Sequence, residues 1–155
     1  MEIIPVESGS YLLLARLLKD ISIRIGALGV HNFEAGLYFY CGSARGPGGL
    51  KARISHHLRP SKSPSWHFDY LKPNVMIETA WFAITDEPLE CCFVHCLSSY
   101  PQAKQPVRFF GSRDCQNGCH SHLVMFSLNE DIKNIDELIK RAYGGTKATP
   151  VFQIC

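Results

Sequence analysis

The sequence predicts an α/β (α+β) domain over residues 1–155, with a mixed or mainly antiparallel central sheet flanked by helices. Segments rich in β-branched and aromatic residues alternate with segments whose apolar residues repeat every three to four positions, the period of a helix. The length of 155 residues, with 46% hydrophobic and 19% charged, suits one packed core. Neither a repeat nor a low-complexity linker divides the chain, so a single domain is expected.

Three strands are expected in the first part of the chain. Residues 9–18 (GSYLLLARLL) and 21–25 (ISIRI) have the composition of strands, and a hairpin through Lys19 and Asp20 would join them. A loop rich in glycine follows. Residues 36–42 (GLYFYCG) then form a third strand, because they are rich in aromatic residues and bounded by glycines.

A glycine-rich turn at residues 45–49 (RGPGG) leads into a short amphipathic helix at residues 50–58. Its apolar residues recur every four positions: Leu50, Ile54 and Leu58. Arg53 and His57 are also four residues apart, so both project from one edge of the apolar stripe. There a side chain is anchored in the fold and still reaches a surface site.

Five elements are expected in the rest of the chain. They are a strand at 75–84, a helix at 88–97, strands at 108–110 and 123–128, and a helix at 134–143 that Gly144 and Gly145 end. The helix at 88–97 is expected to bury Leu89, Cys92, Phe93, Cys96 and Leu97, with Glu90 beside that stripe.

Positive charge is concentrated in one segment. The chain has a formal net charge of +2, yet residues 45–72 hold six lysines and arginines against Asp69 alone. A basic surface for a polyanion is the expectation, and a solvated basic face is the alternative.

Cysteine usage and hydropathy bear on location. The seven cysteines are odd in number, and Cys91 and Cys92 are neighbours, which argues against a secreted disulfide framework. The apolar run at residues 11–18 is too short to span a bilayer and lacks a basic lead-in. A cytoplasmic protein without a membrane segment is therefore expected.

Four separated elements resemble the GIY-YIG nuclease superfamily. Residues 9–11 (GSY) and 40–42 (YCG) are similar to its paired strand motifs. Arg53 and His57 match its helix with a catalytic arginine, and Glu90 matches its metal-binding glutamate. Four elements in the right order form a specific signal, whereas a lone YxG does not.

Within that superfamily the chain resembles the DUF123 branch, which is also found fused to a DNA glycosylase of the endonuclease III type. The resemblance covers residues 8–128 and rests on three stretches: 38–53 (YFYCGSARGPGGLKAR), 66–71 (WHFDYL), and 110–115 (FGSRDC) with 121–123 (SHL). The chain departs from better-studied nucleases in two ways. The two strand motifs lie further apart, and Ser43 stands where some members have lysine.

The resemblance implies a DNA endonuclease that hydrolyses phosphodiester bonds with Mg²⁺ or Mn²⁺ in DNA repair or recombination. Its catalytic residues would be Tyr11, Tyr40, Arg53, His57 and Glu90. Tyr40 would accept or relay a proton from the attacking water, with Tyr11 and His57 assisting it. Arg53 would donate paired hydrogen bonds to the phosphate, and Glu90 would supply an oxygen ligand to the metal.

The expected DNA contacts surround these groups: Gly42, Ser43, Arg45, Lys51, His56, Arg59 and His67. RNA is an alternative substrate, and a DNA glycosylase or another repair enzyme is the expected partner. His67 and Asp69 would share one face of an extended segment, where they bind substrate or orient each other. Packing around Trp66 and Tyr70 is the alternative.

Two other functions fit the same sequence. The first is a nucleic-acid-binding module of the same fold that cleaves poorly and acts with a repair enzyme. The second is a zinc-stabilised interaction domain, with ligands drawn from Cys115, Cys119, His120 and His122. Buried or hydrogen-bonded side chains are the alternative for this cluster, and His122 would equally serve the phosphate site. Three cysteines are expected as small core residues: Cys91, Cys92 and Cys96.

Overall fold

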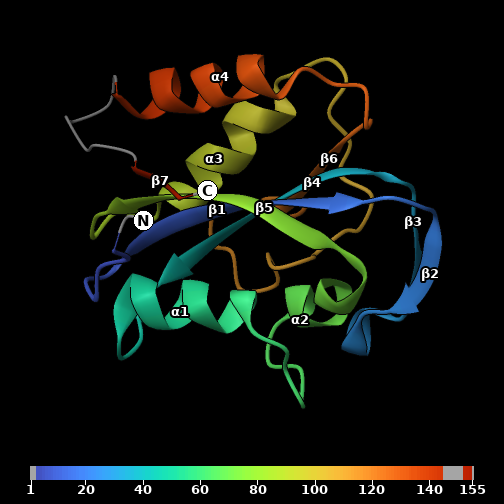
Figure 1. Ribbon diagram of the computed structural model, residues 1–155, viewed down its shortest axis with the longest axis horizontal. Helices are drawn as coiled ribbons and strands as arrows, with labels where there is room; N and C mark the ends of the chain where they lie inside the picture. Colours follow the sequence, from blue (N-terminus) through green and yellow to red (C-terminus); the bar gives the residue numbers. More distant parts are fainter. Residues whose placement is uncertain (1–2, 145–151, 155) are drawn as a thin grey trace.

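The computed structural model describes residues 3–144 and 152–154 and shows an antiparallel five-stranded sheet with helices on both faces (Figure 1). The strands of this sheet lie in the order β6-β4-β1-β5-β7. Helices α1 and α2 cover one face, and α3 and α4 cover the other. This arrangement confirms the predicted fold class.

The bounds of the elements follow the chain. They are β1 Gly9–Leu17, β2 Ile21–Arg24, η1 Gly26–Leu28, β3 Val30–Phe33, β4 Gly36–Ala44, α1 Gly49–Leu58, α2 His67–Leu71, η2 Lys72–Asn74, β5 Met76–Ile84, α3 Leu89–Ser98, β6 Leu123–Phe126, α4 Ile132–Gly144 and β7 Phe152–Ile154. Gly145, expected to end the last helix, lies outside the described residues. Within residues 3–144 and 152–154, no helix is long and apolar enough to cross a membrane.

The sheet divides the interior into two apolar clusters. Along β1, Tyr11 and Leu13 pack on the side of α1 and α2, whereas Leu12 and Leu14 pack on the side of α3 and α4. This follows from the alternation of side chains along a strand. Because both faces of β1 are buried, its sequence is nearly continuously apolar.

The predicted hairpin between the first two strands is wrong. The edges of β1 are occupied by β4 on one side and β5 on the other, so β2 has no place beside it. Strand β2 instead pairs with β3, which lies in a segment expected to be a loop. The turn between them closes with a hydrogen bond of 2.8 Å from Ile25 N to Gly29 O.

Other local expectations also need correction. Residues 108–110 form turns rather than a strand, and the WHFDYL segment begins helix α2 instead of an extended strand. On α3 the exposed Cys92 and half-buried Cys96 do not belong to the core, because the buried face of the helix is formed by Leu89, Phe93, Val94 and Leu97.

The glycine of the second strand motif is required by packing. Gly42 lies opposite Tyr11 in the β1–β4 register. A Cβ at residue 42 would lie 2.5 Å from the Cζ and Oη atoms of Tyr11, which is closer than real contacts allow. The Tyr11 ring therefore occupies the space that any side chain at this position would need.

Gly42→Ala is expected to destabilise the fold by about 1–3 kcal/mol, because the buried Tyr11 ring has to shift. Urea denaturation followed by circular dichroism measures the effect. Gly46→Ala is the matched control, since nothing lies within 4 Å of a Cβ built there. Equal stabilities of the two variants would contradict the packing role of Gly42.

Candidate active site

A cavity of about 600 Å³ opens where strand β6 stops covering the edge of β4. Strand β6 pairs with β4 only from Leu37 to Tyr40, so the next residues of β4 face the cavity instead of a neighbouring strand. Among its lining residues are Tyr40 from β4, Arg53 from α1 and Glu90 from α3. Three predicted catalytic residues, far apart in sequence, therefore meet at one site.

Arg53 is held at the cavity wall by an aromatic side chain. Its guanidinium carbon lies 3.9 Å from the centre of the Trp66 ring, within cation–π distance. Both residues are half-buried and line the cavity. Trp66 thus limits the positions that the guanidinium adopts. The sequence predicts only a packing role for Trp66, within the WHFDYL motif.

Glu90 is positioned by Ser10, which is not among the site residues predicted from the sequence. The Ser10 hydroxyl donates a hydrogen bond of 3.2 Å to Glu90 Oε2, and Leu89 N donates one of 3.1 Å to Ser10 Oγ. Glu90 lies in the first turn of α3, where the helix dipole favours a carboxylate. No local signal in the sequence marks Ser10, because β1 also contains the polar residue Arg16.

Tyr11 and His57 lie behind Tyr40 rather than on the cavity wall. Tyr11 is 0% exposed and His57 is 1% exposed, and Tyr11 Oη lies 2.8 Å from His57 Nε2. Their ring centroids are 6.3 Å and 5.7 Å from that of Tyr40. These two predicted catalytic residues therefore contact Tyr40 from within the core.

Burial sets the protonation states of these rings. Burial lowers the pKa of His57 to about 3, although the nearby Asp69 charge raises it, so the imidazole is neutral near pH 7. Burial also raises the pKa of Tyr40, and the positive charge of Arg53 only partly opposes this. Tyr40 is therefore a protonated phenol in the free protein.

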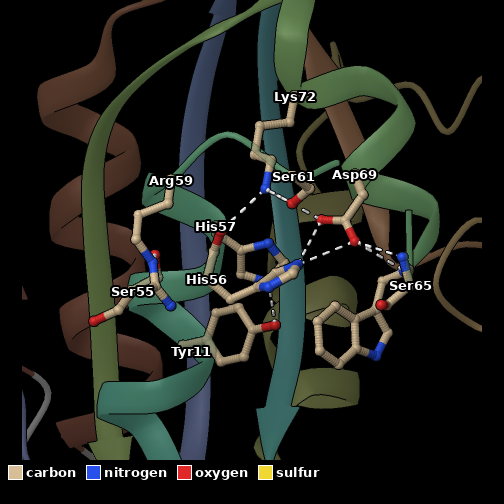
Figure 2. A network of polar contacts seen from close by, with 10 residues as sticks. Tyr11, Ser55, His56, His57, Arg59, Ser61, Ser65, Asp69 and Lys72 are labelled. Carbon is tan, nitrogen blue, oxygen red and sulfur yellow. Dashed lines mark hydrogen bonds and ion pairs between the residues drawn. The ribbon is translucent and has the colours of Figure 1, made fainter. Parts of the chain in front are cut away.

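A buried carboxylate organises the chain next to the cavity (Figure 2). Asp69 lies 3.0 Å from His56 Nε2 and accepts hydrogen bonds from the backbone N–H groups of Ser65 and Trp66. Lys72 Nζ is 3.4 Å from the same carboxylate. Burial raises the pKa of Asp69, but these hydrogen bonds outweigh burial and lower it overall. The network fixes the segment that carries Trp66.

The predicted pairing of His67 with Asp69 is wrong. Because the segment is helical, Asp69 turns toward His56, while His67 Nδ1 accepts a hydrogen bond of 2.9 Å from Gly111 N. His67 still lines the cavity and connects α2 to the segment before β6.

The structure separates the predicted DNA contacts into two sets. Gly42, Ser43 and His67 line the cavity. The others are not among its lining residues: Lys51 and Arg59 are exposed on or just after α1, His56 pairs with Asp69, and Arg45 is bonded to the backbone oxygens of Thr85 and Glu87. Arg45 therefore anchors the loop before α3.

Next to Glu90, a cluster of three cysteines and one histidine can hold a metal ion. The ligand atoms of Cys91, Cys115, Cys119 and His122 all lie within 4.8 Å of one another. The predicted ligand His120 is exposed and outside the cluster, and Cys91 takes its place. The sequence predicts a core position for Cys91, because the helix that carries it has an apolar face. Only the packing of α3 against residues 115–122 reveals its neighbours.

Fold and site together define an α+β protein with a Tyr/Arg/Glu cavity beside a Cys/His cluster. The family model "Domain of unknown function DUF123" matches residues 10–144, and the chain belongs to the DUF123 family. The matched range includes every cavity and cluster residue described above. Comparison with curated proteins and with solved structures gives no significant match.

The buried neutral His57 makes stability depend on pH. The unfolded imidazole takes up a proton near pH 6.5 but the folded one only near pH 3, so stability falls as the pH is lowered between these values. We expect His57→Gln to reduce this pH dependence by about 1.4 kcal/mol per pH unit. Urea denaturation at a series of pH values from 6.5 to 4 measures it.

The pKa values of His67 and His122 are also lowered by burial, and both residues remain in the variant, so the difference isolates His57. Tyr11→Phe is the control that keeps the buried imidazole and should keep the pH dependence. If the free energy of unfolding changes with pH equally in wild type and His57→Gln, the assignment of this pH dependence to His57 is wrong.

Proposed function

We propose that the protein is a metal-dependent endonuclease that hydrolyses phosphodiester bonds in DNA. The observation that carries this proposal is the convergence of Tyr40, Arg53 and Glu90 on one cavity. The three supply what the reaction needs: a group for proton transfer, a fixed positive charge and a metal ligand. The likeness of their motifs to GIY-YIG nucleases supports the same reaction.

Arg53 is suited to bind the scissile phosphate. Its planar guanidinium is always charged and donates two parallel hydrogen bonds to phosphate oxygens. Trp66 restrains it at the wall, so less side-chain entropy is lost when the phosphate binds. This placement stabilises negative charge that develops on the phosphate during attack.

Glu90 fits the requirements of Mg²⁺ or Mn²⁺. A carboxylate is a hard oxygen ligand, and Mg²⁺ keeps several waters and takes other ligands from a substrate phosphate. The hydrogen bond from Ser10 leaves the second carboxylate oxygen available. When bound, the ion would polarise the phosphate. The neighbouring thiols are soft ligands that do not suit Mg²⁺.

Tyr40 would act as a proton relay. With its pKa raised by burial, the phenol of Tyr40 holds its proton in the free protein, and it lines the cavity where it could donate that proton to a bound group. Tyr11 and His57 pack behind it and keep its ring in place. The exposed positive charges of Lys51 and Arg59, on or just after α1, would attract the nucleic-acid backbone.

A second candidate function is a binding module of the same fold that cleaves poorly. The observation that favours it is the protonated Tyr40, which is a weak base in the free protein. In either case we infer a cytoplasmic role in DNA repair or recombination, beside a DNA glycosylase or another repair enzyme. RNA is the alternative substrate, and the cleavage assay below includes it.

Glu90→Gln is expected to abolish cleavage and preserve both the fold and DNA affinity, because the amide keeps the shape and removes the charge that attracts the metal. Cleavage of linear, nicked, branched and abasic DNA and of RNA, in Mg²⁺ or Mn²⁺, tests this. Glu137→Gln, on the exposed surface of α4, is the control and should cleave normally. Binding without cleavage by the wild type would favour the module instead.

Arg53→Ala is expected to lower the cleavage rate by about 10²-fold or more and to weaken DNA binding, because the phosphate loses its paired donors. Single-turnover kinetics and fluorescence anisotropy separate the two effects. Arg59→Ala removes an exposed charge from the end of the same helix and should weaken binding without a comparable loss of rate. Equal losses of rate in both variants would argue against a specific role for Arg53.

A further inference from the structure

Three segments bring the Cys/His cluster together. Cys91 comes from the first turn of α3, Cys115 and Cys119 from the long connection between α3 and β6, and His122 from the residue before β6. Cys91 Sγ lies 3.5 Å from Cys115 Sγ and 3.9 Å from His122 Nε2. Among the described residues, no disulfide joins Cys91, Cys115 or Cys119, so a disulfide does not account for this proximity.

These separations match a tetrahedral zinc site. Two sulfur atoms, each about 2.3 Å from a tetrahedral zinc ion, lie about 3.8 Å apart. The observed sulfur–sulfur separation of 3.5 Å and the limit of 4.8 Å for the whole cluster bracket that value. We propose that Cys91, Cys115, Cys119 and His122 bind one Zn²⁺ ion.

The donor set selects the metal and its role. Three thiolates and one imidazole are soft and borderline ligands that suit zinc and reject Mg²⁺. Four protein ligands leave no position for water or substrate, which is typical of a structural zinc site. The cluster is thus chemically distinct from Glu90, although the two are adjacent in sequence.

The surroundings of two ligands are also arranged for metal binding. The backbone N–H groups of Asn117 and Cys119 point toward the thiol of Cys115, as is favourable for a thiolate. The His122 ring has its Nε2 toward Cys91, and a hydrogen bond with the backbone of Gly111 contacts the same ring. Such a second partner orients a metal-bound imidazole.

The connection from residue 99 to residue 122 explains why a metal would be useful. It contains turns and a single bridge from Lys104 to Met125, and no helix or strand. Phe109 and Gly118 adopt positive φ angles of 67° and 70°. Long connections without regular structure need other restraints. A zinc ion would tie this one to α3.

The proposed zinc would also shape the cavity. Cys91 and Cys115 line it, together with Arg113 and Asp114 from the same connection. Binding the connection to α3 would therefore hold one wall of the cavity beside Glu90. This role requires an ordered wall and does not depend on cleavage, so it stands or falls separately from the endonuclease proposal.

The test is the zinc content of the full chain, purified without chelators and without added zinc. Inductively coupled plasma mass spectrometry should find one zinc per chain in the wild type and loss of that zinc in Cys91→Ser and Cys115→Ser. Cys92→Ser is the matched control, because Cys92 is the exposed neighbour of Cys91 on the same helix. His120→Ala is the second control and should also keep the metal.

A second measurement covers the case in which a ligand variant fails to fold. Replacement of the metal in the wild type by Co²⁺ should give the intense visible bands of tetrahedral cobalt and the sulfur-to-cobalt charge-transfer bands of thiolate ligation. Absence of zinc from the wild type, with a Cys91–Cys115 disulfide or free thiols in its place, would overturn the proposal. Retention of zinc by folded Cys91→Ser, or octahedral Co²⁺ bands, would also overturn it.

Discussion

The pairing of β1 with β4 in the middle of the sheet is the constraint on which the site depends. It places Tyr11 opposite Gly42, so the tyrosine ring fills the space of the missing side chain and reaches His57. The preceding residue, Ser10, points to the other face and holds Glu90. Consecutive residues of one strand thus hold His57 behind Tyr40 and Glu90 at the cavity wall.

Polar groups next to the cavity are buried with partners and are therefore fixed in place. The Asp69 carboxylate is fully enclosed but accepts several hydrogen bonds, so its charge is retained and the chain around Trp66 is held. The His57 imidazole is also buried, but its Nδ1 has no hydrogen-bond partner among the described residues, and the ring stays neutral. Both side chains are buried, yet Asp69 keeps its charge and His57 is neutral, because their hydrogen-bond partners differ.

Several features could be predicted from sequence because they are local. The strand around Tyr40 and the helix carrying Arg53 follow from composition and periodicity, and the structure confirms both. The motif spacing also selected three residues that meet at the cavity. Ser10 and Cys91 were not selected, because a lone serine in a strand and a cysteine on an amphipathic helix carry no local signal. Their roles depend on neighbours far away in the chain.

The amino-acid sequence by itself determined the fold class, most of the strands and helices, and the residue types available for chemistry, since these follow from the hydrophobic pattern and from motif order. Only the tertiary structure decided that β2 pairs with β3, that Asp69 turns to His56, and that Cys91 joins Cys115, Cys119 and His122. The physical reason is that strand pairing and side-chain clustering are set by which edges and faces remain free after the core has packed. That competition involves the whole chain at once.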